Sequence, residues 1–496
     1  MLLWVRKINK NKSIYTKSFN GFLWLLGGST TKAVLQVLII AILARLLNPK
    51  EFGLIATAMI VVKFTEMIAN VGVGSALIQK QKINDRHISI SFLFVIVLGF
   101  LIYFIFLFLL NPILGSFFNQ LDLVNVLNLI CISIPFNMFS QICYSLLQKK
   151  FKFKSLAGLD IFSYTIGYGF VGIFLAYLNY GVFSLVWAII IQSILYAIFL
   201  YYINPFKISL KFYRKELNEL LFSGSGFIVS DFFNYFARNG DYLIISKYIG
   251  IEALGLYSRA YTLMNAVDRI IGKVINKVMF STFSKVQNNK IEITKILNRT
   301  VGILFLFLIP ISFYCYLFAE EIIIIILGKK WLSILIPYKI LLIGMTFRVG
   351  YKLLASCLKG IGYIKYNLFF QFIYMSIILI GSYIVSDYGI SGIALVVSFA
   401  LLIHFSLQVY FLFIKKLISI NLVFKKFFNV IPITILVLFT LFYINQFLII
   451  FSHPIHIIFF SIIYIFIFLM IILQFNFTLL IPSDFLWLYK KLKNNK

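Results

Sequence analysis

Long apolar stretches separated by short polar gaps recur from residue 21 to residue 480. Most of them reach or exceed about 20 residues, the length that an α-helix needs to cross a bilayer. They lack the strict apolar–polar alternation of strands in a membrane barrel. The pattern therefore predicts an all-α membrane protein with about 14 transmembrane helices. The predicted helices are 21–46, 53–78, 88–110, 121–147, 157–178, 182–203, 218–247, 254–282, 300–327, 333–358, 366–385, 390–414, 428–450 and 456–480.

The basic residues in the gaps predict the orientation of these helices. Cytoplasmic loops of membrane proteins accumulate Lys and Arg. In this chain they gather in residues 1–20, in every second gap and in the C-terminal tail, whereas the alternate gaps hold Lys50, Lys329 and Lys330 alone. This asymmetry predicts an even number of helices with both termini in the cytoplasm. The N-terminal segment has no small-residue cleavage site, so we expect it to be retained.

Composition supports a membrane protein and argues against a nucleic-acid partner. The chain is 61% hydrophobic and 12% charged, whereas a soluble protein carries about 25% charged residues. Its formal net charge of +29 would suggest nucleic-acid binding in a soluble chain. Here the basic residues lie between apolar runs, where they contact lipid headgroups. The cysteines lie inside apolar runs without a CxxC pair, so we interpret them as packing residues.

Two pairs of similar segments suggest an internal duplication. ARLLNPKEFGLIATA aligns with SKYIGIEALGLYSRA and places Gly53 over Gly255. LNYGVFSLV aligns with SDYGISGIA and places Gly181 over Gly389. Six helices per copy is an even number, so the copies are predicted to be parallel repeats about an axis along the membrane normal. Such repeats place the substrate site between them, near the midplane.

The duplication divides the chain into four predicted parts. These are a cytoplasmic segment (1–20), an N-lobe of six helices (21–205), a C-lobe of six helices (206–415), and two further helices with a basic cytoplasmic tail (416–496).

Charged residues lie near the centre of several predicted helices. Each would cost about 2.5–3.5 kcal/mol if it faced lipid, so we expect them to line an aqueous cavity or to pair. They form polar stripes at helical spacing on helices 1, 2, 7, 8 and 10. Cations outnumber carboxylates there, and Arg binds phosphate oxygens in a bidentate manner. The candidate residues for binding a pyrophosphate are Lys32, Lys63, Arg238, Arg269, Arg348 and Lys352.

A simpler interpretation exists for some of these residues. Lys63 and Glu66, like Arg238 and Asp241, are three residues apart and could form intrahelical ion pairs. His404 in the twelfth helix is interpreted as a packed core histidine in preference to a proton relay.

The sequence lacks the motifs of several enzyme classes. It contains no GxxxxGK[ST] nucleotide-binding loop, no HExxH and no Cys/His cluster with metal-ligand spacing. The predicted outer loops are short, whereas a membrane enzyme usually needs a larger polar loop for its active site. We therefore expect a protein that is not an enzyme and needs no cofactor or metal.

Two segments resemble a known family. LNPKEFGLIATAMIVVKFTEMIANVGVGSALIQKQ (47–81) and GDYLIISKYIGIEALGLYSRAYTLM (240–264), together with the predicted lobes, resemble the polysaccharide transporter family of the MATE-like flippase superfamily. Wzx-type O-antigen and capsule flippases belong to it. The resemblance implies a bacterial inner-membrane flippase for undecaprenyl-pyrophosphate-linked oligosaccharide. The repeat units would cross from the cytoplasmic to the periplasmic leaflet by alternating access, for O-antigen, capsule or exopolysaccharide synthesis.

The resemblance also implies an energy source and protein partners. Relatives are thought to use ion gradients, so H⁺ or Na⁺ is expected to couple to carboxylates, and polymerase or assembly proteins are expected partners. An unpaired buried carboxylate can take up a proton, whereas one paired with Arg stays charged. The ion-coupling candidates are Glu66, Asp231, Asp241 and Asp268.

Three other functions stay open at this point. A flippase for lipid II or another lipid-linked glycan would have the same fold and the same kind of carrier. A multidrug exporter of this fold would need an acidic cavity for cationic substrates. A membrane polysaccharide polymerase would need a larger ordered outer loop.

Overall fold

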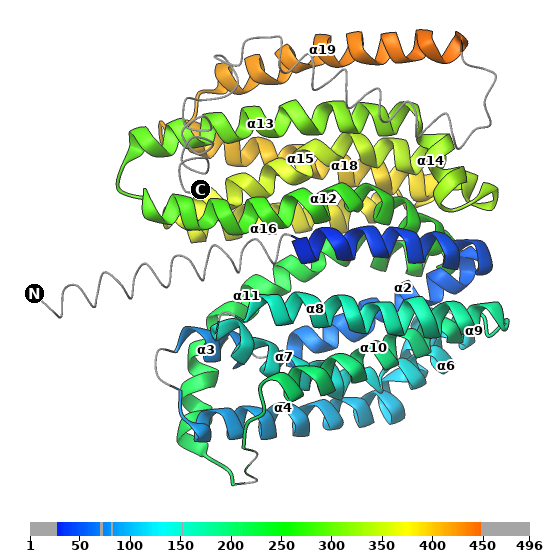
Figure 1. Ribbon diagram of the computed structural model, residues 1–496, viewed down its shortest axis with the longest axis vertical. Coiled ribbons are helices and arrows are strands. Elements are labelled where there is room, and N and C mark those ends of the chain that lie inside the picture. Colours follow the sequence, from blue (N-terminus) through cyan, green and yellow to red (C-terminus); the bar gives the residue numbers. More distant parts are fainter. Residues whose placement is uncertain are drawn as a thin grey trace, which may run out of the picture. The chain divides into compact units, whose positions relative to one another are not determined.

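The computed structural model describes residues 27–447, apart from 70–72, 81–82, 119, 151, 208 and 210 (Figure 1). Within this part the regular elements are all helices and no strand occurs, which confirms the predicted all-α class. The predicted N-terminal segment, the fourteenth helix and the basic tail lie outside the described residues.

Eight helices in the described ranges are long and apolar enough to cross a membrane, and a helix pair bent by 41° makes a possible ninth span. The chain is therefore a multi-pass integral membrane protein. The eight are Gly27–Leu46, Asp85–Phe117, Phe153–Tyr177, Val182–Ile203, Lys290–Leu317, Lys329–Gly360, Ile364–Ile384 and Ser386–Ile414, and the bent pair is Leu121–Ile130 with Ser133–Lys149. Of the other predicted ranges, 53–78 is occupied by α2 (Pro49–Ala69) and α3 (Val73–Gln79), which residues 70–72 outside the described part separate, and 218–247 is covered by α11 (Arg214–Ile244) with η3 (Ile245–Ile249). The range 254–282 lies within α12 (Ile251–Lys285), and α19 (Ile420–Phe447) covers the described part, 428–447, of the range 428–450. The total of fourteen stays a prediction.

The chain divides into two compact units, Met1–Thr262 with Met375–Ile393, and Leu263–Tyr374 with Ala394–Lys496. The boundary falls inside one long helix, α12 (Ile251–Lys285). The lobes predicted from the duplication, 21–205 and 206–415, stay a prediction.

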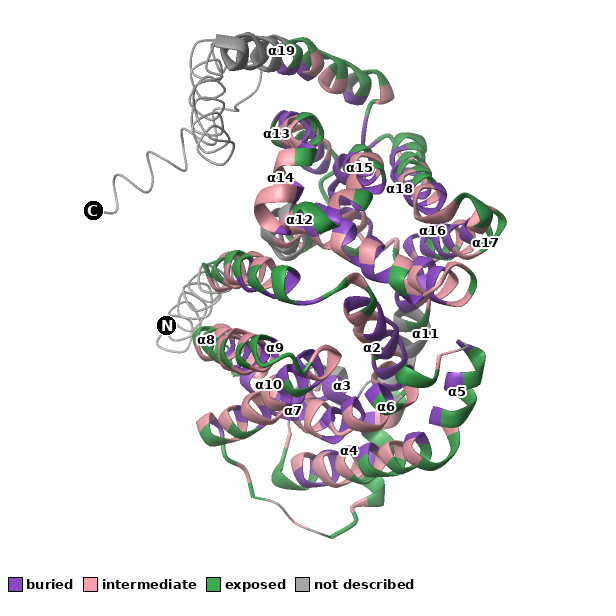
Figure 2. Ribbon diagram, turned by 90° about the vertical axis from the view of Figure 1, so that its right-hand side faces the viewer, coloured by how far each residue is buried: buried purple, intermediate pink, exposed green. Residues whose placement is uncertain are grey.

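In the first unit, α7 packs against α4 and α10, and α2 packs against α11. Buried aliphatic side chains such as Val62, Val126 and Ile134 form its core, and Figure 2 shows buried stretches along α2. Its described elements begin with the helix Gly27–Leu46 and continue with α2 (Pro49–Ala69), α3 (Val73–Gln79), α4 (Asp85–Ile105), η1 (Phe106–Leu110), α5 (Asn111–Phe117), α6 (Leu121–Ile130), α7 (Ser133–Lys149), α8 (Phe153–Tyr164), η2 (Thr165–Gly172), α9 (Ile173–Tyr177), α10 (Val182–Ile203), α11 (Arg214–Ile244), η3 (Ile245–Ile249), the start of α12, η5 (Ile377–Gly381), α17 (Ser382–Ile384) and η6 (Ser386–Tyr388).

In the second unit, α13 packs against both α15 and α19. Phe305, Val349 and Leu412 belong to its buried core. The ammonium group of Lys426 on α19 donates a hydrogen bond to the carbonyl oxygen of Asn298 on α13. Besides the rest of α12, its elements are α13 (Lys290–Leu317), α14 (Ala319–Ile326), η4 (Lys329–Ile334), α15 (Leu335–Gly360), most of α16 (Ile364–Ser376), most of α18 (Gly389–Ile414) and α19 (Ile420–Phe447).

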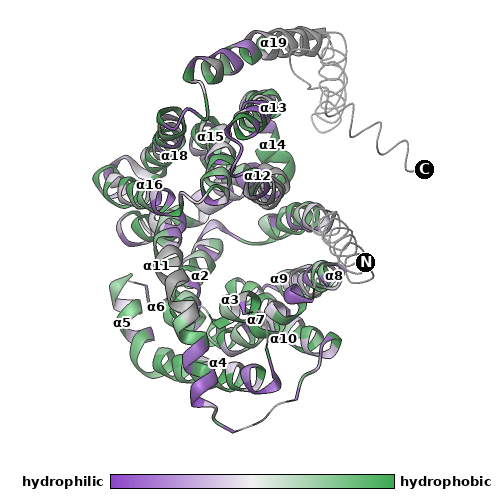
Figure 3. Ribbon diagram, turned by 90° about the vertical axis from the view of Figure 1, so that its left-hand side faces the viewer, coloured by the Kyte–Doolittle hydropathy of each residue, from purple (hydrophilic) through white to green (hydrophobic). Residues whose placement is uncertain are grey.

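Asparagine side chains cap the first turns of two helices. The side chain of Asn84 accepts a hydrogen bond of 3.0 Å from the His87 backbone and caps α4, and Asn289 caps α13 in the same way. Such caps satisfy backbone N–H groups that the first helical turn leaves open. Figure 3 shows that α4 itself is mostly hydrophobic, whereas the start of α11 is hydrophilic. There, Glu219 pairs with Lys80 from the end of α3.

Both sequence echoes mark similar local structures. Gly181 and Gly389 have φ angles of 54° and 67°, a backbone region that favours glycine, and a helix starts at or directly after each. In the other echo, a Cβ on Gly53 would fall on the carbonyl oxygen of Ile251, and one on Gly255 would fall on that of Pro49. Pro49 aligns with Ile251 in this echo, so the contact between α2 and α12 is reciprocal. The duplication of whole lobes stays a prediction.

Candidate functional site

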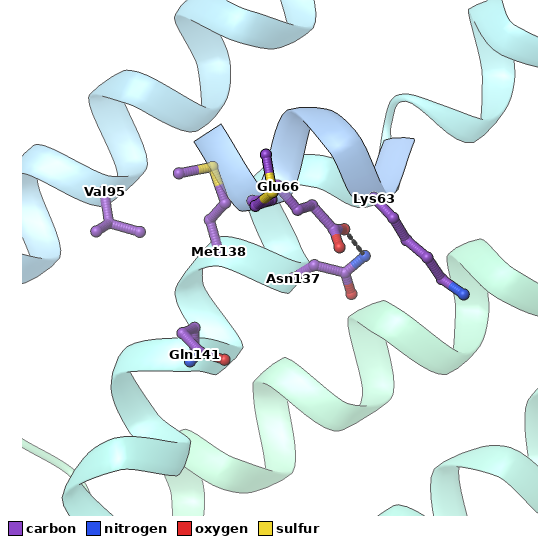
Figure 4. A pocket seen from close by; sticks show the side chains of 7 residues that line it. Lys63, Glu66, Val95, Asn137, Met138 and Gln141 are labelled. Atoms are coloured by element: carbon purple, nitrogen blue, oxygen red, sulfur yellow. Dashed lines mark hydrogen bonds between the residues drawn. The ribbon is translucent and has the colours of Figure 1, made fainter. Parts of the chain in front are cut away.

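A polar pocket of about 290 Å³ lies in the first unit. Lys63 and Glu66, three residues apart, project into it from one face of α2, and Asn137 and Gln141, four residues apart, do so from α7. The amide nitrogen of Asn137 donates a hydrogen bond of 2.7 Å to the Glu66 carboxylate. In Figure 4 the Lys63 side chain extends away from that carboxylate. Met67, Val95 and Met138 complete the lining.

The pocket thus combines one carboxylate, one amine and two amides with an apolar remainder. Such a set can hold a proton or a small hydrated cation close to Glu66. Sequence reasoning identified Lys63 and Glu66 but missed Asn137 and Gln141. Amides are abundant in this chain, and the signal that could have found these two is their helical spacing on α7.

Lys32 forms an ion pair that the sequence did not predict. Its ammonium nitrogen lies 2.5 Å from an oxygen of Asp160 on α8 and 5.5 Å from the centre of the Tyr164 ring. Asp160 was overlooked because it lies near the beginning of the predicted fifth helix, away from the membrane centre. Lys32 therefore has a carboxylate partner within the same unit.

Asp241, Arg238 and Asp231 lie on α11. The Asp241 side chain is buried, with 1% exposure, and accepts a hydrogen bond of 2.9 Å from the hydroxyl of Tyr257 on α12. Arg238, one turn earlier, is exposed. The side chain of Asp231 lies outside the described part of the structure.

The second unit contains a buried cluster of opposite charges, which we call the cation–carboxylate triad: Asp268, Arg348 and Lys352. Lys352 on α15 donates a hydrogen bond to Oδ2 of Asp268 on α12, and the Arg348 Nε lies 3.6 Å from the same oxygen. The three side chains are 17%, 8% and 10% exposed for Lys352, Asp268 and Arg348 respectively. Two cations thus face one carboxylate, and the triad carries a net positive charge.

Local sequence explains how the triad forms. Arg348 and Lys352 are four residues apart and share one face of α15. Gly272 follows Asp268 by one turn of α12, and a Cβ there would contact Asp268 Oδ1 and lie 3.7 Å from Lys352 Cδ. Glycine at this position leaves room for the carboxylate. Arg269, next to Asp268 in the sequence, is partly buried.

The structure therefore sorts the predicted residues into separate groups. Lys63 and Glu66 share the pocket, Lys32 pairs with Asp160, and the triad joins two predicted cations to a predicted ion-coupling carboxylate. Their roles in substrate binding and ion coupling stay predictions. Within the described residues, no group of three or more His, Cys, Asp and Glu residues is placed to hold a metal ion.

His404 lies in the core of the second unit with 1% exposure. Its ring stacks against Tyr351 and Tyr374, with centroids 4.6 Å and 5.0 Å away. Its Nε2 lies 3.0 Å from the side-chain amide of Gln408. This packing fits the interpretation of His404 as a core histidine.

Comparisons with known proteins address the family. The sequence profile of a family described as "polysaccharide biosynthesis protein" matches residues 42–336, more than half of the chain. The succinoglycan biosynthesis transport protein ExoT of Rhizobium meliloti (strain 1021) is 24% identical over 62% of this chain and 62% of its own length. The lipopolysaccharide biosynthesis protein WzxC of Escherichia coli (strain K12) is 20% identical over 76% and 78%. The chain thus spans less than two thirds of the Rhizobium protein.

Solved structures address the fold. The lipid II flippase MurJ in an inward closed conformation aligns with a TM-score of 0.63 at 18% identity, over 92% of this chain and 97% of MurJ. An inward-facing MATE multidrug transporter of the MOP superfamily aligns with a TM-score of 0.59 at 14% identity, over 78% and 97%. These likenesses confirm the predicted MATE-like fold. With the profile match, they confirm the resemblance inferred from the sequence: this chain belongs to the polysaccharide biosynthesis protein family and is a multi-pass membrane protein with the MATE-like fold.

Proposed function

We propose that this protein is a flippase for lipid-linked oligosaccharide repeat units in surface polysaccharide synthesis. Its substrate would be an oligosaccharide on undecaprenyl pyrophosphate, which crosses from the cytoplasmic to the periplasmic leaflet of the bacterial inner membrane. Relatives named for the biosynthesis of succinoglycan, teichuronic acid and lipopolysaccharide support a role in surface polysaccharides.

The cation–carboxylate triad is the observation that carries the proposal. Burying an ionised group is costly unless it is paired, and this triad retains one more cation than carboxylate. The two cations would attract an anionic headgroup. Arg348 presents a planar fork that matches phosphate oxygens, and Lys352 adds a point charge. These cations would repel the cationic substrates of a drug exporter.

Movement of the substrate would follow alternating access of the two predicted lobes (21–205 and 206–415). The predicted cations Lys32, Lys63, Arg238 and Arg269 would add to the attraction for the pyrophosphate. Glu66 is the favoured ion-coupling residue, because its hydrogen-bond partner is the neutral amide of Asn137.

Deletion of the gene in its native host tests the function. We expect loss of long-chain surface polysaccharide and accumulation of lipid-linked repeat units on the cytoplasmic side. Complementation with R348A or R269A, made at normal levels, should fail to restore export. Intact polysaccharide with altered drug sensitivity would favour an exporter. Repeat units that reach the periplasmic leaflet but stay unpolymerised would favour a polymerase.

A further inference from the structure

The triad has an unusual feature for an anion site, because its two cations already share a carboxylate oxygen. Lys352 Nζ and Arg348 Nε both approach Oδ2 of Asp268. A phosphate oxygen bound by the same two cations would occupy the position of this Oδ2. An anionic headgroup and Asp268 therefore compete for the position between Arg348 Nε and Lys352 Nζ.

We propose that Asp268 is an internal counter-ion that occupies the anion site of Arg348 and Lys352 until the diphosphate of the substrate displaces it. This inference rests on the proposed function and deepens it. It gives Asp268 a role different from the ion coupling that the sequence suggested, because a carboxylate held by two cations keeps its charge.

The surroundings of Asp268 support an exchange of partners. Its carboxylate lies against Gly272, which has no side chain to press on it. The three side chains keep exposures between 8% and 17%, so the site is shielded but not sealed. Without a counter-ion, two neighbouring cations at this depth would repel each other. Asp268 would thus stabilise the substrate-free protein and weaken premature binding of other anions.

The consequence for affinity has a definite sign. The substrate would bind to molecules in which Asp268 has moved away from the two cations. The apparent dissociation constant of the substrate therefore rises as the fraction of such molecules falls. If about one tenth of the molecules have the cations free, removing the carboxylate should tighten anion binding about tenfold. Release of the substrate would slow correspondingly, and turnover should fall even though affinity rises.

The test uses purified full-length protein and inorganic pyrophosphate as the probe. Calorimetric titration should give about tenfold tighter binding for D268N than for the wild type, and pyrophosphate should raise the melting temperature of D268N more. G272A should shift affinity in the same direction, because its methyl group displaces the carboxylate while the charge is kept. D122N is the matched control, because it removes a carboxylate from the Lys50 pair elsewhere and should leave pyrophosphate binding unchanged.

Two results would overturn the inference. Weaker pyrophosphate binding by D268N would show that Asp268 holds the cations in place and does not compete with the ligand. Equal binding by D268N and the wild type would show that the triad is not the anion site. The proposed function would survive either result if gene deletion still abolished polysaccharide export, and it would fail separately if export persisted.

Discussion

Two carboxylates within helices of this protein, the partly buried Glu66 in the first unit and the buried Asp268 in the second, have contrasting partners. Glu66 accepts a hydrogen bond from a neutral amide in a polar pocket. Asp268 is held by the side chains of Lys352 and Arg348. Both were predicted as ion-coupling candidates, because each lies on a polar stripe of an apolar helix.

The difference in partners suggests different roles. Glu66 takes its hydrogen bond from a neutral amide, which a protonated carboxyl can also accept, and the charge of Lys63 acts on it through space alone. A carboxylate between two cations loses two attractive interactions when it is protonated, so it stays charged. We therefore expect ion coupling at the pocket and anion binding at the triad.

The largest expected effect comes from removing Arg348. R348A takes away the guanidinium fork and one of the two cations, and it leaves Asp268 paired with Lys352 alone. We expect complementation of the deletion strain to fail. R348K keeps the charge but not the fork and should restore export in part. Full export by R348A at normal protein levels would remove the triad from the mechanism.

Glu66 should show a different kind of loss. E66Q keeps the size of the side chain but removes its titratable group, so we expect transport that no longer responds to an ion gradient. Exchange of substrate across the membrane at equilibrium should persist. Export measured with and without an ionophore checks this, with N137L as a second variant that removes the Asn137 amide and its hydrogen bond but keeps the Glu66 carboxylate. Gradient-dependent transport by E66Q would contradict the assignment.

The ion pair of Lys32 with Asp160 should matter less. Its side chains are 19% and 39% exposed, and partly exposed pairs contribute about 0.2–1 kcal/mol. D160N should therefore lower the melting temperature by a few degrees at most and retain export. Complete loss of export would contradict this and would show that the Lys32–Asp160 pair is essential for transport.

The smallest effect is expected at the Lys50–Asp122 pair. Its side chains are 55% and 59% exposed, so water and salt screen the attraction. D122N should leave both export and thermal stability unchanged, which sets the baseline for the other variants. A marked change would mean that this contact between the first turns of α2 and α6 contributes to transport.

The sequence predicted helices better than it predicted partners. Apolar runs report directly on membrane-crossing helices, and the described part of the chain bears this out at ranges such as 182–203. Charges near the centres of predicted helices also singled out Glu66, Asp268 and Arg348 as candidate site residues. Periodicity describes one helix at a time, however, and the contacts join different helices.

The missed partners illustrate this limit. Asp160 lies 128 residues from Lys32, and Asn137 lies 71 residues from Glu66. Neither carries a signal of its own, since one is near a helix end and the other is a common amide. Lys352 was predicted to bind the pyrophosphate and Asp268 to couple to an ion. Their hydrogen bond could not be inferred from the sequence, where they lie 84 residues apart.

Reconstitution tests the central claim most directly. Purified protein in liposomes, supplied with an undecaprenyl-pyrophosphate-linked oligosaccharide in one leaflet, should move it to the other leaflet. Inorganic pyrophosphate should inhibit that movement, and R348A should abolish it. If the wild-type protein leaves the lipid in place under an imposed proton or sodium gradient, the flippase account is contradicted.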